Sequence, residues 1–443
     1  MTRRGSRHQA SRPRPLPALS HAEQQRRAAA AAALQRRKTV LTAVTRILAV
    51  YSMALCLAAP DPIPIRTSSL NGQGWLDEIF HGHVERFLSQ MGLAKEAFRR
   101  LSYELQITYG LHATKHVTAD EKLATFLYFA RTGSSSRLLQ ERFQRSAETI
   151  HNSIYTVLNI LVGPFYMKYV HLPPNETPPE IKADPKLYPY FRQARGAIDG
   201  SHFHAWVRDS VSGQYRNRKG FIGQNVLAAC NFAMLFVYIL SGWEGSAADS
   251  AIYAYARDHD FAVPAGMYFL ADAGFPLCDV LMTPYHYHAV RYHLREWGTA
   301  GQRPQNREEL FNLRHAQARN VVERIFGILK RRWMVFQRAP EYPIEMQAKL
   351  VPAIAALHNF IRIHEPLDDF SAPQQPAASS VPLSRSTSSI DSFMQDEPRD
   401  ILPEELGMEI SAAECRRAEL RRDTIAQKMW EDYQRILRER GQQ

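Results

Sequence analysis

The stretch GAIDGSHFHAW, residues 196–206, contains an apolar run that stops at a single acid, Asp199, with a glycine directly behind it. Short apolar runs bounded by glycine are typical of β-strands. MYFLADAGFPL, residues 267–277, repeats this arrangement, since Asp272 ends an apolar run and is followed closely by a glycine and a proline. Strand ends are where α/β sheets present chemical groups. One such acid usually forms a turn, but two in the same context predict a shared site.

A mixed α/β domain is predicted over residues 191–365. ARGAID (194–199) and HFHAWV (202–207) are predicted as two separate strands, and further short apolar runs follow them. After these runs the strands alternate with helices, with a long helix over about 304–333 and a further helix that includes LHNFI (357–361). Strands that first form a meander and then alternate with helices favour a mixed sheet.

The long helix carries a third acid, Glu323. Its apolar residues follow a helical period, and Glu323 lies just beside that stripe, on the same flank as Arg319 and Lys330. A carboxylate at the edge of a buried helix face is well placed for a metal ligand at the mouth of a sheet. The alternative is an ion pair with Arg319 or Lys330, a kind of contact that contributes little stability when it is exposed.

Residues 67–170 are predicted to be helical. TADEKLATFLYFARTG, residues 118–133, opens with a capping box formed by Thr118 and Glu121. A short helix follows, and then a longer one that begins after Ser146. Three helices with a short middle one suit a helix-turn-helix unit. A plain helical bundle with a charged face explains the pattern equally well.

Arginines cluster near the turn of this predicted unit. Lys and Arg side chains that neutralise phosphates supply much of the affinity of proteins for DNA. We therefore predict that DNA binding resides mainly in residues 70–165, together with the basic N-terminal arm. The candidate phosphate contacts in this region are Arg137, Arg142 and Arg145.

The composition favours a polyanionic partner. The chain has 443 residues, a formal net charge of +11 and a pI near 9.5. This charge does not by itself distinguish nucleic acid from an anionic membrane surface. The four cysteines are far apart and form no CxxC pair. That spacing argues against a structural zinc site or a disulfide framework and favours a reducing compartment.

Flanking segments complete the predicted organisation. The N-terminal arm is rich in Arg, Ala and Pro and is predicted to be disordered, because it cannot bury enough apolar surface. Its RRK run at 36–38 suits nuclear import or phosphate contact. The predicted segments are a disordered basic arm (1–38), a hydrophobic or amphipathic helix with a linker (39–66), a Pro-rich linker (171–190), a disordered linker (366–400) and a C-terminal amphipathic helix (401–443).

One stretch imitates a membrane span. TVLTAVTRILAVYSMALCLAA, residues 39–59, is about long enough to cross a bilayer. However, Arg46 lies in its middle, where a charge costs about 2.5–3.5 kcal/mol on insertion scales. An amphipathic or buried helix is therefore predicted, and no stable membrane association is expected. A membrane-surface protein anchored by this stretch is the alternative.

Five segments follow one another between residues 196 and 333: GAIDGSHFHAW, YRNRKGFIGQNVLAACN, GWEGSAADS, MYFLADAGFPL and NLRHAQARNVVERIFGILKRRW. In order and spacing they resemble the catalytic core of PIF/Harbinger-type DDE transposases, a group that includes the domesticated Harbinger transposase-derived nucleases. The likeness covers about residues 66–365. Upstream it includes SSRLLQERFQRSAETI, which resembles the family's N-terminal domain.

The resemblance implies a ribonuclease H-like fold in which Asp199, Asp272 and Glu323 form an Asp–Asp–Glu triad that holds two divalent cations. Two such ions, about 3.5–4 Å apart, activate the nucleophile and stabilise the leaving oxygen in phosphodiester cleavage. Carboxylate ligands favour Mg²⁺ or Mn²⁺ over zinc. Asp199 would bridge the two ions. The candidate contacts to the DNA backbone are Lys219, Arg319, Lys330 and Arg331.

The expected function is that of a metal-dependent DNA endonuclease or transposase, which cleaves element ends and transfers the 3′-hydroxyl to target DNA in the nucleus. The alternative is a domesticated, catalytically silent DNA-binding or scaffold protein. The intact triad favours the first. Ala248 stands where the family pattern usually has a histidine. This departure and the unusual tails favour the silent DNA-binding or scaffold protein. A Myb-like accessory protein and a homodimer remain open as partners.

Overall fold

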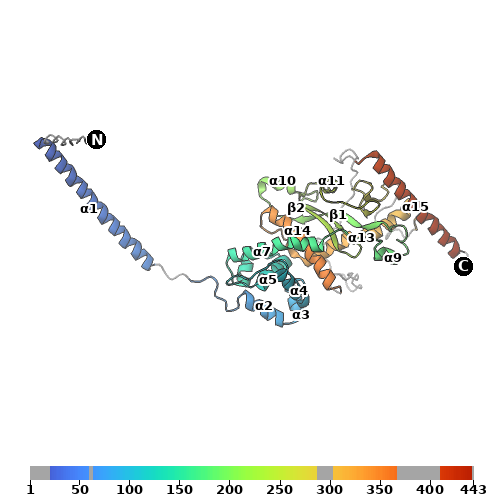
Figure 1. Cartoon of the computed structure of the whole chain (residues 1–443), viewed down its shortest axis with the longest axis horizontal. Coiled ribbons are helices and arrows are strands. Elements are labelled where there is room, and N and C mark those ends of the chain that lie inside the picture. The colour runs from blue at the N-terminus through green and yellow to red at the C-terminus, as the bar shows by residue number, and fades with distance from the viewer. Residues whose placement is uncertain (1–19, 59–62, 287–302, 367–409, 442–443) are drawn as a thin grey trace, which may run out of the picture. The chain divides into compact units, whose positions relative to one another are not determined.

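The computed structural model describes residues 20–58, 63–286, 303–366 and 410–441 (Figure 1). Two compact units make up the chain, Met1–Ile65 and Arg66–Gln443. The first contains helix α1 (His21–Ala58), and the second contains the sheet and the remaining described helices. Residues 367–400 of the predicted disordered linker lie outside the described residues.

Helix α1 begins earlier than the sequence predicts. The Ser20 hydroxyl accepts a hydrogen bond from the N–H of Glu23 at 3.4 Å, and the Glu23 carboxylate accepts one from the N–H of Ser20 at 3.0 Å. This capping box precedes an alanine-rich run with high helix propensity. The prediction of a disordered arm over residues 1–38 is therefore wrong for residues 21–38. Residues 1–19 lie outside the described part.

The side chains of α1 are exposed from His21 to Cys56. Within its own unit, α1 is therefore not a buried helix over residues 39–56. Among the described residues, α1 is the one helix that is long and apolar enough to cross a bilayer, by length and composition only. Arg46 lies within its apolar stretch, so an inserted α1 would carry a charge at about mid-membrane.

The second unit begins with a group of helices, which includes the predicted set of three with a short helix in the middle. The Thr118 hydroxyl caps α5 by accepting a hydrogen bond from the N–H of Glu121 at 3.0 Å. The helix that follows α5 is short, as predicted, and the next one is long. These helices are α2 (Gly72–His81), α3 (Val84–Met91), α4 (Lys95–Ile107), α5 (Ala119–Thr132), α6 (Ser136–Phe143), α7 (Ala147–Val162) and α8 (Pro164–Tyr169).

A five-stranded mixed sheet follows, with the strand order β3-β2-β1-β4-β5. The pairs β1–β2 and β2–β3 are antiparallel, whereas β1–β4 and β4–β5 are parallel. This mixed α/β sheet is compatible with a ribonuclease H-like DDE core. The strands are β1 (Ala194–His204), β2 (Gly223–Cys230), β3 (Phe236–Glu244), β4 (Tyr268–Leu270) and β5 (Leu281–Met282).

Strand β1 joins two segments that the sequence predicts as separate strands. Its antiparallel pairing with β2 runs from Ala197 opposite Cys230 to His204 opposite Gly223, and it continues through Gly200. The prediction of two strands is therefore wrong. The glycine does not end the strand, because its neighbour β2 supplies hydrogen-bond partners on both sides of it.

Side chains of the sheet alternate between two hydrophobic clusters, as the period of two residues in a strand requires. On β2, Val226 and Ala228 join the cluster that contains α13 and α14, while Leu227 and Ala229 join the cluster that contains α11. The sheet therefore lies between α11 on one face and α13 and α14 on the other. These helices are α11 (Asp249–His259), α13 (Arg307–Arg332) and α14 (Ile344–His364).

The helical region and the α13–α14 face of the sheet share one hydrophobic cluster, and α7 packs against α14. The predicted linker at 171–190 contains α9 (Pro179–Ala183), whose Ile181 is fully buried in that cluster. This segment is therefore packed into the body of the second unit. The predicted C-terminal amphipathic helix is α15 (Ala412–Gly441), and it packs along α13.

Candidate active site

Asp199 lies within β1 and not at its end, which corrects the prediction. The parallel neighbour β4 reaches only as far as Ala197, which is paired with Leu270. Asp199 is thus two residues beyond the last pair with β4, at the point where the sheet opens on that side. Its side chain is 20% exposed, and its Oδ1 accepts a hydrogen bond from the N–H of Gly200 at 3.0 Å.

Asp272 follows β4 by two residues, as predicted for an acid beyond a strand end. Continuing the β1–β4 register from Leu270 places Asp272 beside Asp199. The Oδ1 atom of Asp272 accepts a hydrogen bond from the N–H of Gly274 at 2.8 Å, so the turn holds this carboxylate in place. The two acids that share a local sequence pattern therefore come from adjacent strands.

Glu323 joins them from α13 through Arg319. The Arg319 Nη1 atom lies 3.2 Å from Oδ2 of Asp199, and its Nη2 atom donates a short hydrogen bond to Oε1 of Glu323. Arg319 is four residues before Glu323 and therefore lies on the same face of the helix. The ion pair that was the alternative interpretation of Glu323 is present, but it also includes Asp199.

Neighbouring charges strongly affect Asp199 and Arg319. Burial raises the pKa of Asp199 well above its ordinary value, and the Arg319 guanidinium opposes the rise. Three neighbouring acids add to the rise through their negative charge, namely Asp272, Asp249 and Glu323. Burial by itself lowers the pKa of Arg319, but the charges of Asp199, Glu323 and Asp272 outweigh it and raise that pKa overall. The site is therefore rich in carboxylates, with a charged guanidinium among them.

Asp249 is a fourth acid that the sequence analysis does not propose as a site residue. It is the first residue of α11, and its Oδ1 accepts a hydrogen bond from Nδ2 of Asn225 at 2.6 Å. It approaches β1 so closely that a Cβ atom at Gly200 would lie 2.1 Å from Oδ1. The segment GSAADS, which contains Asp249, is part of the family resemblance. An acid in that segment at the start of a helix was the sequence signal that could have identified Asp249 as a site residue.

Lys330 anchors α13 to β1. Its Nζ atom donates hydrogen bonds of 2.8 Å to the Ser201 hydroxyl and to the carbonyl oxygen of His202, and it lies 4.7 Å from the ring centroid of Phe203. Its predicted role as a phosphate contact therefore competes with an existing structural role. Of the other backbone contacts predicted in this domain, Arg331 and Lys219 are exposed, whereas Arg319 is mostly buried against Asp199 and Glu323.

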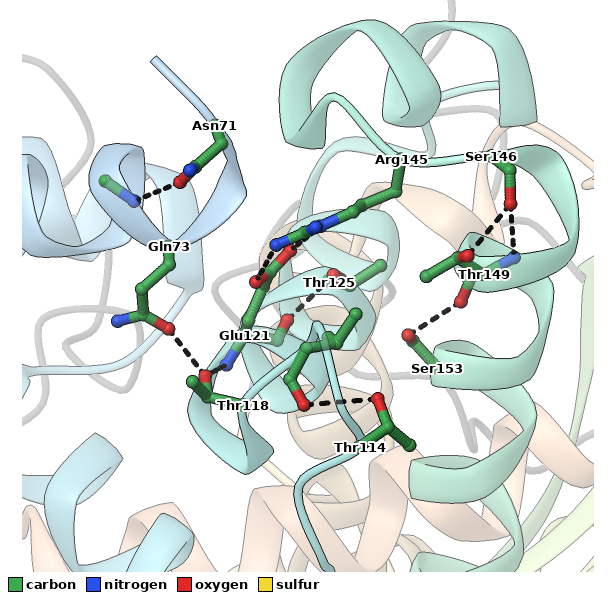
Figure 2. Close-up of polar contacts among 12 residues, drawn as sticks. Asn71, Gln73, Thr114, Thr118, Glu121, Thr125, Arg145, Ser146, Thr149 and Ser153 are labelled. Carbon is green, nitrogen blue, oxygen red and sulfur yellow. Dashed lines mark hydrogen bonds and ion pairs between the residues drawn. The ribbon is translucent and has the colours of Figure 1, made fainter. Parts of the chain in front are cut away.

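The three arginines predicted to bind DNA in the helical region differ in their surroundings. Arg145 forms a two-pronged ion pair with Glu121, which is fully buried (Figure 2). Arg142 lies with its guanidinium 5.0 Å from the ring centroid of Trp75, and Arg137 is exposed. Arg145 thus has a structural role here, which competes with its predicted role as a phosphate contact. The Glu121 carboxylate binds Arg145. The capping contact of α5 is therefore made by the Thr118 hydroxyl.

The donor chemistry of the cluster suits a hard divalent cation, because every acid supplies carboxylate oxygens. The spacing is not that of a formed metal centre. Across the residues that the structure describes, no group of three or more His, Cys, Asp or Glu side chains is arranged to hold a metal ion. Arg319 lies between Asp199 and Glu323 and provides the positive charge that these two acids need.

Two family models match the chain. Residues 198–359 match one described as DDE superfamily endonuclease, and this range includes Asp199, Asp272 and Glu323. Residues 67–163, which cover α2 to α7, match one described as Domain of unknown function (DUF8040). No curated protein and no solved structure matches the chain. The endonuclease match supports a DDE transposase family, and with it a transposase-type nuclease, for this chain.

Proposed function

We propose that this protein is a metal-dependent DNA endonuclease of the Harbinger type, which cleaves phosphodiester bonds at element ends and transfers the 3′-hydroxyl to target DNA. One observation carries the proposal. Three acids from separate elements, Asp199, Asp272 and Glu323, gather around a single guanidinium inside the region that matches the endonuclease family. A partly buried surplus of carboxylates is unfavourable by itself, so it indicates a site that receives positive charge.

The triad would hold Mg²⁺ or Mn²⁺. When bound, such ions polarise the scissile phosphate and lower the pKa of the attacking water or hydroxyl. The chain itself supplies the rigid frame. The turn at Gly274 orients Asp272, and Lys330 fixes α13 against β1, so that the helix bearing Glu323 keeps its position. These contacts would hold the carboxylates in place before a DNA strand binds.

DNA would approach through exposed cations. Arg137 on α6 and Arg331 and Lys219 in the catalytic region are exposed, and the chain is strongly basic. Contacts of this kind are independent of sequence and weaken as salt rises. Arg142 remains a candidate although its guanidinium lies over Trp75, because that contact leaves the residue exposed.

Cleavage of a labelled element-end duplex tests the proposal. Glu323→Gln keeps shape and helix propensity but removes the charge, so we expect Mg²⁺- or Mn²⁺-dependent cleavage to fall at least about 10²-fold, which is roughly 2.7 kcal/mol. Asp199→Asn and Asp272→Asn should behave alike, and double variants should lose little more because the triad acts as a unit. Glu341→Gln, at an exposed glutamate, is the matched control.

Binding in EDTA completes the test. Each triad variant should bind DNA as tightly as wild type or more tightly, because a lost carboxylate reduces repulsion of phosphate. If wild type cuts and the Glu323→Gln protein cuts equally well, Glu323 is only the ion-pair partner of Arg319 and the nuclease assignment of the triad fails.

A catalytically silent DNA-binding or scaffold protein is the second candidate. The observation that favours it is at the start of α11, where Ala248 is the N-cap residue and makes no side-chain capping bond. The resembling family usually has a histidine at that position. This candidate predicts that wild type binds the element-end duplex but does not cleave it when Mg²⁺ or Mn²⁺ is present in the same assay.

We further propose that the protein acts in the nucleus and that α1 does not insert into membranes, because Arg46 lies within its apolar stretch. A fluorescent fusion should accumulate in nuclei. Pelleting of the full-length protein with carbonate-washed membranes would contradict this. We also propose a Myb-like accessory protein and a homodimer. Co-purification with the full-length chain tests the accessory protein, and light scattering of the full-length chain tests the homodimer.

A further inference from the structure

Arg319 contacts two acids that the proposed function needs as metal ligands. Its Nη1 atom is 3.2 Å from Asp199, its Nη2 atom bonds Glu323, and the side chain is only 17% exposed. The fork of a guanidinium fits this arrangement, because it presents separate N–H donors to separate oxygens. Both carboxylates therefore already have a cationic partner.

Asp272 is held differently. Its Oδ1 atom accepts a hydrogen bond from a backbone N–H, that of Gly274. A neutral donor orients a carboxylate without cancelling its charge, so it leaves the acid able to attract a cation. The guanidinium of Arg319 does cancel charge on Asp199 and Glu323. The two kinds of partner thus predict different effects on cation binding at this site.

Arg319 cannot give up these acids by losing its proton. Guanidinium groups remain protonated in proteins, and the surrounding carboxylates raise the pKa of Arg319 still further. A divalent cation placed on the same oxygens would be repelled by the guanidinium at short range. The guanidinium therefore opposes binding of a divalent cation to these two acids, and Arg319 can leave only by moving its side chain.

On the basis of the proposed function, we infer that Arg319 is a resident countercation that occupies Asp199 and Glu323 until DNA binds. A backbone phosphate offers the bidentate oxygen geometry that a guanidinium prefers, so DNA draws Arg319 away and frees the two carboxylates for the divalent ion. Metal binding is then coupled to DNA binding. Coupling of this kind would limit cleavage chemistry to the DNA-bound protein.

Manganese binding to the full-length protein tests this inference without using activity. Free Mn²⁺ is counted by its electron paramagnetic resonance signal during titration of wild type, Arg319→Gln and the control Arg324→Gln, an exposed arginine of the same helix. Without DNA, we expect Arg319→Gln to bind Mn²⁺ at least tenfold more tightly than wild type. Arg324→Gln should match wild type.

A short duplex is then added, and a titration of duplex alone corrects for Mn²⁺ bound by the DNA. Wild type should gain Mn²⁺ affinity at least tenfold, whereas Arg319→Gln should gain little because its carboxylates are already free. The wild-type comparison needs no substitution, so the absence of a gain overturns the inference even if Arg319→Gln folds poorly, and a gain of equal size in a folded Arg319→Gln protein overturns it as well. Equal Mn²⁺ affinity of wild type with and without DNA overturns it.

A further variant separates this inference from the proposed function. Asp199→Asn should lose Mn²⁺ affinity with DNA present. If it does, and wild type binds Mn²⁺ equally well with and without DNA, the metal site stands and the role of Arg319 is wrong. If wild type and Arg319→Gln both fail to bind Mn²⁺ under either condition, the metal-dependent nuclease and the countercation role are both overturned.

Discussion

Two arginine–carboxylate clusters in this protein differ in charge balance. In the helical region Arg145 meets Glu121 alone, through bonds of 2.7 and 2.8 Å, and Glu121 is fully buried (Figure 2). At the sheet, Arg319 meets Asp199 and Glu323 directly and Asp272 electrostatically. One positive charge satisfies the first cluster but not the second.

The difference shows how the same residue types serve two purposes. A balanced, bidentate pair in the interior needs nothing further, and it fixes the helices that carry its members. A surplus of carboxylates stores unfavourable repulsion, which burial increases and which a divalent cation would relieve. Counting charges around each arginine therefore separates the structural cluster from the candidate active site.

The largest expected effect is on the balanced pair. Glu121→Gln leaves Arg145 without its charge partner, and breaking a buried pair in this way costs about 3 kcal/mol of the free energy of unfolding. Urea denaturation of the full-length protein measures the loss. Glu141→Gln, at an exposed glutamate of α6, is the control and should change stability by less than about 0.5 kcal/mol. A similarly small change for Glu121→Gln would remove the contrast between the clusters.

The opposite sign is expected at the sheet. Asp199→Asn removes one of several repelling charges and leaves Arg319 paired with Glu323, so without metal it should raise the free energy of unfolding at pH 7 by about 1–2 kcal/mol. Asp209→Asn, an exposed aspartate, serves as the control. A loss of stability in Asp199→Asn would mean that this acid is a structural ion-pair partner like Glu121.

The pH dependence of stability sharpens the same contrast. Because the pKa of Asp199 is raised in the folded state, the folded protein holds its proton to higher pH than the unfolded chain does. The free energy of unfolding should therefore fall as pH rises from about 4 toward the raised pKa, by up to about 1.4 kcal/mol for each pH unit. The difference between wild type and Asp199→Asn isolates this fall. Parallel curves for the two proteins would rule it out.

The smallest expected effect concerns DNA. Arg137→Ala should leave stability unchanged but flatten the dependence of log affinity on log salt by about 0.9 if one phosphate contact is lost. Arg145→Ala should instead lower stability, because it leaves buried Glu121 unpaired. Salt-titrated binding and urea denaturation of both variants distinguish the two arginines. An unchanged salt slope for Arg137→Ala removes this residue from the DNA interface.

Local sequence predicted much of the candidate site. Apolar runs that end in an acid and a glycine identified Asp199 and Asp272, and helical periodicity placed Glu323 beside the buried face of α13. Each of these signals depends on neighbours along the chain, which is why they could be recognised without a structure. The helix start at residue 21 is equally local, since Ser20 and Glu23 form a capping box.

What only the tertiary structure decided were contacts across the sheet. Strand β1 continues past Gly200 because β2 pairs with it, and Asp249 reaches that glycine from α11. The link between Arg319 and Asp199 spans 120 positions of sequence. The same holds for Arg145, which looked like a phosphate contact until Glu121 proved to be its partner. Residue types and periodicity determine which positions carry charge. The partner that balances each charge depends on tertiary packing, because burial makes an unpaired charge unfavourable.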